Sequence, residues 1–121
     1  MNVLVIDYGM GNLRSVEKGF EASGAKPKIS SDPRDIEKAS KIILPGVGAF
    51  THAMRELKKR KLVGPIREKI KSGTPYLGLC LGLQLLFSES EEGDSLKGFG
   101  IIEGPVKRFS NKLKVPHMGW N

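Results

Sequence analysis

The chain contains a single cysteine, few aromatic residues and no long apolar run. Cys80 has no second cysteine to pair with, so an internal disulfide is excluded and the cytoplasm is the expected location. No segment approaches the ~20 apolar residues that span a bilayer. The first residues, MNVLVIDYG, show neither the basic region nor the cleavage site of a signal peptide. We therefore expect no membrane association.

Basic residues outnumber acidic ones and give the 121 residues a formal net charge of +7. Lysines and arginines are nonetheless spread along the chain, and the one dense run, KKRK at 58–61, is typical of a solvated helix end. With 1 Trp, 2 Tyr and 5 Phe, the chain lacks the mixture of basic and aromatic side chains that stacks nucleic-acid bases. We expect no nucleic-acid partner, and no motif indicates a metal or a cofactor.

Short apolar runs alternate with amphipathic stretches along most of the chain. The runs predict strands and the stretches between them predict helices. Asn12 is the expected cap of the first helix, and Ser31 or Asp32, ahead of Pro33, is that of the second. Strands are expected at 2–6, 26–30, 41–45 and 76–79, helices at 49–59, 61–71 and 81–87, and short antiparallel strands within 100–104, 106–110 and 114–121. This alternation predicts an α/β domain with a mainly parallel sheet and helices on both faces.

Three turns with unusual composition each follow a predicted strand. They are DYGMGN at 7–12, PGVGAF at 45–50 and the turn at Cys80. Connections between parallel strands place every strand-to-helix turn at the carboxyl edge of the sheet. We therefore expect these turns to gather at one crevice, although they lie far apart in the sequence.

Cys80 lies in the stretch Gly78-Leu79-Cys80-Leu81-Gly82, between a predicted strand and a predicted helix. A nucleophile on such a sharp turn needs small residues two positions away, because larger side chains would collide with neighbouring elements. The dipole and free N–H groups of the following helix favour a thiolate, and the Leu81 N–H is placed to bind a developing oxyanion. The alternative is an inert buried thiol, which is common for free cysteine.

The loop PGVGAF is the second candidate element. Gly46 and Gly48 allow the backbone to approach a ligand closely and to adopt unusual dihedral angles. The N–H of Val47 or Gly48 could then supply a second donor for an oxyanion. A tight turn that merely requires glycine is the alternative interpretation.

Polar residues after the cysteine are weaker candidates. Gln84 follows Cys80 by four residues and so lies on the same helical face, although a partly exposed helix residue explains it equally well. The acidic run SESEEGDS at 88–95 is typical of a solvated loop. From residue chemistry alone its carboxylates are equal candidates for binding a ligand: Glu89, Glu91, Glu92 and Asp94.

With these motifs in place, the sequence resembles the class I, triad-type glutamine amidotransferases, and among them the glutaminase subunits of imidazole glycerol phosphate synthase. The resemblance implies that residues 1–121 form a single amidotransferase domain, incomplete and truncated at the carboxyl terminus. It rests on DYGMGN at 7–12, PGVGAF at 45–50, GLCLGLQLLFSESEE at 78–92 and PHMGWN at 116–121.

The resemblance implies that glutamine is hydrolysed to glutamate and that the ammonia passes to a cyclase subunit, within a heterodimer that serves histidine biosynthesis. Cys80 would attack the amide carbon and form a thioester, while the N–H groups of Leu81 and of the Val47-Gly48 turn bind the oxyanion. Gly48, Gln84 and Glu92 match positions that hold the amino-acid end of the substrate. The region that faces the cyclase in the family would contain His117, Met118, Trp120 and Asn121.

A cysteine glutaminase also needs a general base. The family's histidine, oriented by a glutamate, lies near the end of a longer chain, and neither His52 nor His117 matches it. We therefore expect the 121-residue chain alone to be inactive. Two alternatives stay open. One is another cysteine-turn enzyme, either an amidotransferase for a different acceptor or a hydrolase-like protein that uses an acidic residue such as Asp7. The other is a non-catalytic fragment that binds the cyclase or a complementing carboxyl-terminal piece.

Overall fold

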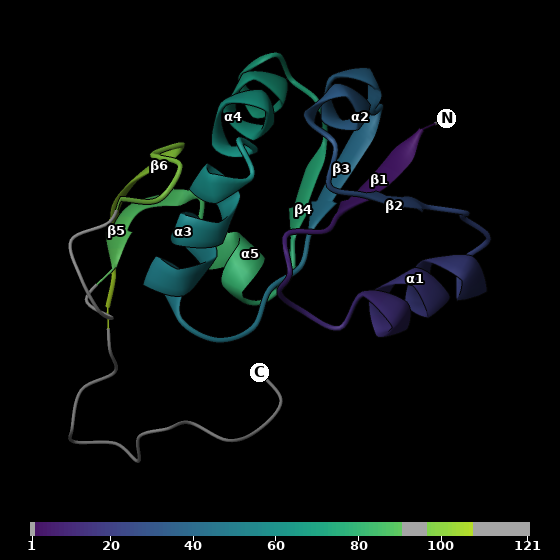
Figure 1. The fold of residues 1–121 in the computed structure, drawn as a ribbon, viewed down its shortest axis with the longest axis horizontal. Coiled ribbons are helices and arrows are strands. Elements are labelled where there is room, and N and C mark those ends of the chain that lie inside the picture. Colours follow the sequence, from purple (N-terminus) through teal and green to yellow (C-terminus); the bar gives the residue numbers. More distant parts are fainter. Residues whose placement is uncertain (1, 91–96, 108–121) are drawn as a thin grey trace.

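A computed structural model of the chain describes residues 2–90 and 97–107 (Figure 1). Its main sheet has four strands, all parallel, in the spatial order β2-β1-β3-β4. The α/β class and the parallel sheet predicted from the sequence are confirmed. The four strands are β1 (Val3–Ile6), β2 (Lys28–Ser30), β3 (Lys41–Leu44) and β4 (Tyr76–Gly78).

Helices cover both faces of this sheet, also as predicted. The helix α1 (Leu13–Ala22) lies alone on one face, while three helices lie on the other: α2 (Pro33–Lys38), α3 (Phe50–Lys59) and α4 (Val63–Lys71) (Figure 1). Alternate strand residues serve the two faces, because successive side chains of a strand point in opposite directions. Val3 and Ile43 line an apolar groove beside Phe20 of α1.

The main core lies between the sheet and the three helices. The alternate side chains of β1 and β3, which point to the opposite face from Val3 and Ile43, include Ile6 and Leu44. They are fully or almost fully buried there. Each helix contributes apolar side chains from one stripe, which is the pattern that predicted these helices. The helical members of the core are Ile36, Phe50, Ala53, Met54, Leu57 and Ile66.

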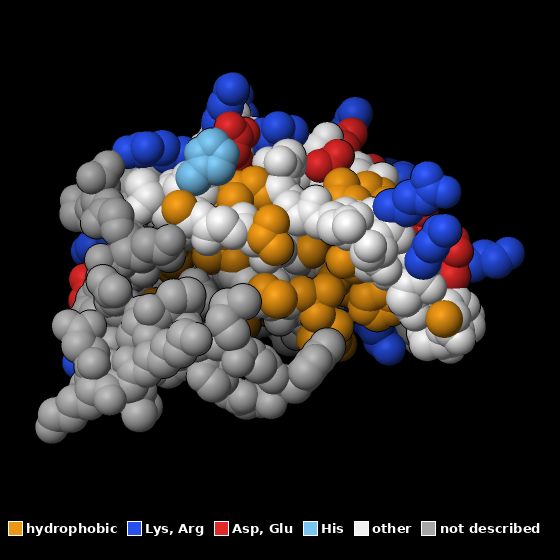
Figure 2. Space-filling model, turned by 90° about the horizontal axis from the view of Figure 1, so that it is seen from below, with side chains coloured by type: hydrophobic (Ala, Val, Ile, Leu, Met, Phe, Trp, Pro, Cys, Tyr) orange, Lys and Arg blue, Asp and Glu red, His pale blue; other side chains and the backbone are white. Residues whose placement is uncertain are grey.

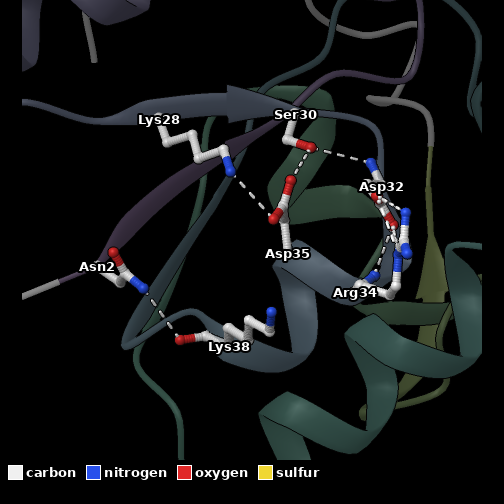
Figure 3. A network of polar contacts seen from close by, with 7 residues as sticks. All are labelled: Asn2, Lys28, Ser30, Asp32, Arg34, Asp35 and Lys38. Atoms are coloured by element: carbon white, nitrogen blue, oxygen red, sulfur yellow. Dashed lines mark hydrogen bonds and ion pairs between the residues drawn. The ribbon is translucent and has the colours of Figure 1, made fainter.

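Both predicted helix caps are present. The Asn12 side chain accepts the Ser15 N–H at 3.2 Å at the start of α1. Of the two candidates for α2, Asp32 is the cap, and it accepts the Arg34 N–H at 2.9 Å ahead of Pro33. Figure 3 shows the polar network around this cap, in which Ser30 at the end of β2 donates to the Asp35 carboxylate of α2 and accepts the Asp32 N–H.

The segment after Cys80 differs from the prediction. The helix α5 (Leu81–Gln84) has four residues only, and the chain then forms β5 (Phe87–Ser90), which pairs with β6 (Ile102–Val106). The pairing is parallel, so the expected antiparallel character is wrong here. The apolar run at 85–87 fits a helix or a strand equally well, and backbone bonds from Ile101 and Ile102 to the Leu86 carbonyl favour the strand.

None of the helices in the described part of the chain is long and apolar enough to cross a membrane. The strands expected within 106–110 and 114–121 lie largely outside the described ranges. Of their residues, only Val106 belongs to a described strand, as the last residue of β6.

Candidate functional site

The loops that follow β1, β3 and β4 meet at one edge of the sheet (Figure 1). The Tyr8 hydroxyl joins the first two, since it donates to the Pro45 carbonyl oxygen at 2.7 Å. The Leu81 N–H joins the last two, since it donates to the Gly46 carbonyl oxygen at 3.3 Å. Figure 2 looks onto this end of the molecule, where hydrophobic side chains gather in the middle and Lys and Arg lie mainly around the rim. The turns therefore meet as the sequence predicts.

Cys80 has the backbone conformation of a sharp strand-to-helix turn. Its φ is 54° and its ψ is −114°, and only one other described non-glycine residue, Lys61, has a positive φ. Such a conformation costs on the order of 1–3 kcal/mol in a residue with a side chain, and it persists only where the surroundings enforce it. The thiol is free and exposed. The burial that the alternative interpretation assumed for this cysteine is therefore wrong.

Glycine is required on both sides of this cysteine. A Cβ on Gly78 would come within 2.6 Å of the backbone of Gly82 and Leu83, and one on Gly82 would overlap the carbonyl oxygen of Leu44. Side chains larger than glycine would therefore collide at both positions, as the sequence predicted. The two glycines let the turn fold back on its own strand and pack against β3.

The helix α5 is too short to have the strong dipole that the sequence predicted beside Cys80. A four-residue helix has little macrodipole, because the dipole grows from aligned peptide units over several turns. The first N–H groups of α5 are also partly used. Gly82 donates to the Leu79 carbonyl and Leu83 to the Cys80 carbonyl, each at 3.0 Å. The helix therefore has a smaller dipole and fewer free N–H groups beside Cys80 than the sequence suggested.

The loop after β3 packs directly against the cysteine turn. Gly46 is buried, and a Cβ placed there would lie 3.1 Å from the Leu81 Cβ. The Gly46 carbonyl accepts the Leu81 N–H, which is the first donor proposed for an oxyanion hole. In this structure that donor is therefore engaged by the protein itself.

The next two residues of the loop are open to solvent. Val47 is 60% exposed, and Gly48 is exposed with a φ of 97°. Neither N–H donates to another residue in the described ranges. Both amides are therefore unbonded to the other described residues.

The remaining predicted residues divide into two groups. Gln84 is half-buried at the last position of α5, four residues after Cys80. The others lie outside the described residues: Glu92, His117, Met118, Trp120 and Asn121.

Two tyrosine hydroxyls, one buried and one partly buried, escaped the sequence analysis. Tyr8 is fully buried and bonds to Pro45, as described above. The hydroxyl of Tyr76 donates to the Gly82 carbonyl oxygen at 2.6 Å, across the cysteine turn. Burial raises the pKa of Tyr8 to about 12 and raises that of Tyr76 as well. Both hydroxyls therefore keep their protons, and their ability to donate, at neutral pH.

The other candidate acid–base groups have separate roles. His52 is exposed in the first turn of α3, and no hydrogen bond joins it to Cys80. The Asp7 carboxylate accepts the Gly9 N–H at 3.0 Å, which closes the turn after β1. Within residues 2–90 and 97–107, no group of three or more His, Cys, Asp or Glu side chains could hold a metal ion.

This combination of an α/β sheet, a strained cysteine turn and a glycine loop is matched by a known family. The sequence profile of "Glutamine amidotransferase class-I" matches residues 4–121, which is nearly the whole chain. The chain therefore belongs to the class I glutamine amidotransferase family.

The chain is also similar to individual proteins with curated descriptions. The chain is 55% identical over 121 residues to "Imidazole glycerol phosphate synthase subunit HisH" of Gloeothece citriformis, an alignment that covers 98% of this chain and 57% of that protein. It is 53% identical over 123 residues to the protein of the same description from Cyanophora paradoxa, covering all of this chain and again 57% of the relative. The chain thus spans somewhat more than half the length of the curated relatives that it matches.

A solved structure described as a glutamine amidotransferase has the same fold. It superposes with a TM-score of 0.76 over 94% of this chain and 60% of that one, at 20% sequence identity. At that identity the likeness establishes the fold alone, and it agrees with the parallel sheet described above.

Proposed function

We propose that this chain supplies the nucleophile, part of the oxyanion hole and part of the glutamine site of a glutaminase. The ammonia would pass to a cyclase subunit that makes imidazole glycerol phosphate, in a cytoplasmic heterodimer. The supporting observation is the strained, exposed Cys80 in a turn that bonds, through Leu81 and Gly46, to the loop with the free N–H groups of Val47 and Gly48. The HisH relatives, named as subunits of imidazole glycerol phosphate synthase, support the substrate and the partner.

In the proposed reaction, the Cys80 thiolate attacks the side-chain amide carbon of glutamine and forms a C–S bond. The carbonyl π electrons move to oxygen, and backbone N–H groups stabilise that oxyanion. Collapse of the tetrahedral intermediate breaks the C–N bond, and a protonated base gives its proton to the departing nitrogen to release ammonia. Water then attacks the thioester, which yields glutamate and restores the thiol.

Gly48, Gln84 and Glu92 are the proposed contacts to the amino-acid end of glutamine. Gly48 and Gln84 lie on either side of the nucleophile in the sequence, Gly48 in the loop after β3 and Gln84 at the end of α5. His117, Met118, Trp120 and Asn121 are the proposed contacts to the cyclase. Tryptophan suits that role, because large aromatic side chains dominate the energetics of protein interfaces.

Neither histidine of the 121 residues is proposed as the general base. His52 is exposed and makes no hydrogen bond with Cys80, and His117 does not match the family's catalytic histidine. Loss of general acid–base catalysis costs about 10²–10⁴-fold in rate. The chain by itself is therefore proposed to bind and position glutamine without turning it over at an enzymatic rate.

Alkylation of Cys80 tests the proposal without requiring turnover. Iodoacetamide should modify Cys80 in the folded chain, and millimolar glutamine should slow the modification, followed by intact-mass spectrometry. Asparagine, one methylene shorter, is the matched control and should protect weakly. Equal rates with glutamine, asparagine and buffer would remove the support for a glutamine site.

A non-catalytic role is the second candidate, since the match to an amidotransferase family does not itself test whether these 121 residues react with glutamine. On this account the chain binds the cyclase or a complementing polypeptide and does not react with glutamine. Binding to the purified cyclase without any protection of Cys80 by glutamine would select this alternative.

A further inference from the structure

Tyr8 is the group that connects the loop after β1 to the loop of the candidate oxyanion hole. Its side chain has no exposed surface, and its hydroxyl donates to the Pro45 carbonyl at 2.7 Å across 37 residues of sequence. Proline has no N–H of its own, so this carbonyl is the only hydrogen-bonding group of its backbone. The hydroxyl therefore fixes the residue that opens the loop.

The same hydroxyl also fills the space beside Gly46. A Cβ built on Gly46 would overlap the Tyr8 hydroxyl oxygen and would come within 3.1 Å of the Leu81 Cβ. Gly46 is thus held between the tyrosine on one side and the cysteine turn on the other. Its carbonyl accepts the Leu81 N–H at 3.3 Å.

We propose that Tyr8 is a positioning residue, and that its hydroxyl keeps the Pro45-Gly46 segment in place so that the Gly46 carbonyl covers the Leu81 N–H. Tyr8 thereby favours the state in which this oxyanion donor is occupied. Releasing the donor requires the Pro45-Gly46 segment to move away from Leu81 as a unit, which breaks the bond from Tyr8 to Pro45. This proposal rests on the proposed function, because the state of the Leu81 N–H affects chemistry only if it binds an oxyanion.

The physical basis is the cost of an unpaired carbonyl. Removing the hydroxyl leaves the buried Pro45 carbonyl without its partner, which destabilises the closed loop more than an open one where water can reach that oxygen. The closed loop then opens more often, and each opening exposes the Leu81 N–H to solvent. Neighbouring amides that bond elsewhere are unaffected, such as the Leu79 N–H, which donates to the Leu44 carbonyl at 3.0 Å.

Amide hydrogen exchange measured by NMR on the whole chain tests this role. In Tyr8→Phe, the Leu81 amide should exchange at least about fivefold faster relative to the Leu79 amide, which corresponds to about 1 kcal/mol. A merely structural role would accelerate both amides together and leave their ratio unchanged, and that outcome would overturn the proposal.

Tyr76→Phe is the matched control. It also removes a tyrosine hydroxyl bonded to a backbone carbonyl, but on Gly82 of the cysteine turn instead of on the loop. The Leu81-to-Leu79 ratio should stay within about twofold of that of the parent chain. A ratio raised equally in both variants would mean that any lost hydroxyl loosens the site, and it would also overturn the proposal.

A second variant at position 8 and a separate alkylation measurement complete the test. If Tyr8→Phe does not fold, 4-fluorophenylalanine at position 8 restores the volume of the hydroxyl without a donor, and the same rise in the ratio is expected. Protection of Cys80 by glutamine is measured separately on the parent chain. A raised ratio without protection would remove the proposed function alone, and protection with an unchanged ratio would remove the role of Tyr8 alone.

Discussion

Gly82 lies against Leu44 so closely that the Leu44 carbonyl oxygen occupies the space that a Cβ on Gly82 would need. The same carbonyl accepts the Leu79 N–H at 3.0 Å. One backbone oxygen therefore joins β3 to the cysteine turn and also limits residue 82 to glycine. The sharpness of the turn at Cys80 depends on this contact.

Substituting Gly82 by alanine should destabilise the fold by about 1–3 kcal/mol, because the added methyl group must displace backbone instead of a flexible side chain. Urea unfolding followed by circular dichroism measures this. Gly19→Ala is the control, since Gly19 lies within α1 with no atom within 4 Å of its added Cβ, and alanine there should stabilise the helix slightly. Equal stability of the two variants would contradict the close packing.

Replacing Cys80 by glycine should leave a more stable protein than replacing it by alanine. Glycine adopts a positive φ without steric penalty, whereas alanine keeps the strain of the present residue, on the order of 1–3 kcal/mol. The greater entropy of glycine in the unfolded chain offsets about 0.4–1 kcal/mol of that gain. A net difference of about 1 kcal/mol is expected in thermal or urea unfolding. Greater stability of the alanine variant would show that the turn is not strained.

Gly46→Ala should be far less damaging in a chain that also carries Tyr8→Phe. Alone, the alanine methyl overlaps the Tyr8 hydroxyl, and an overpacked buried site costs about 1–3 kcal/mol. Loss of that hydroxyl opens room for the methyl, so the two changes should be non-additive by at least about 0.5 kcal/mol. A double-mutant cycle of unfolding free energies measures the coupling. Strict additivity would mean that the hydroxyl and Gly46 do not constrain one another.

Acid should weaken the contact between α2 and β2 shown in Figure 3. The Asp35 carboxylate accepts the Ser30 hydroxyl at 2.5 Å and the Lys28 ammonium at 3.1 Å, and these interactions hold the pKa of Asp35 below its usual 3.8. Since the folded pKa is the lower one, the stabilisation is complete above the unfolded pKa and is lost as the pH falls through the folded value.

Asp35→Asn should therefore lower the melting temperature near pH 7 and have a smaller effect near pH 2. Glu37→Gln is the control, because Glu37 is an exposed carboxylate on the same helix. Thermal melts of both variants across this pH range provide the measurement. An Asp35→Asn effect that is the same at both pH values would rule out the proposed ionic contribution.

The elements of the main sheet were predictable because their signals are local. Asn12 and Asp32 cap helices through their own side chains, and the apolar runs at β1 and β3 are buried as runs of this kind require. The chain after Gln84 was not predictable in the same way. Its apolar residues 85–87 suit a helix by composition, and the choice of a strand depends on partners such as Ile102, which is 15 residues beyond Phe87.

The candidate site shows the same division. The turn at Cys80 could be recognised because Gly78 and Gly82 mark it in the sequence. The roles of Tyr8 and Tyr76 could not, because each hydroxyl bonds to a backbone carbonyl. Every residue has such a carbonyl, so no pattern of side chains identifies which one a buried tyrosine will reach.

The order β2-β1-β3-β4 has a consequence for behaviour at high concentration. In the described sheet, β2 and β4 are the outer strands, and each has three residues directly preceded by a proline, Pro27 or Pro75. A proline has no N–H to offer an incoming strand, and a short edge gives such a strand few bonds. Sheet growth between copies of the chain is therefore disfavoured at both borders, including the one that carries the nucleophile.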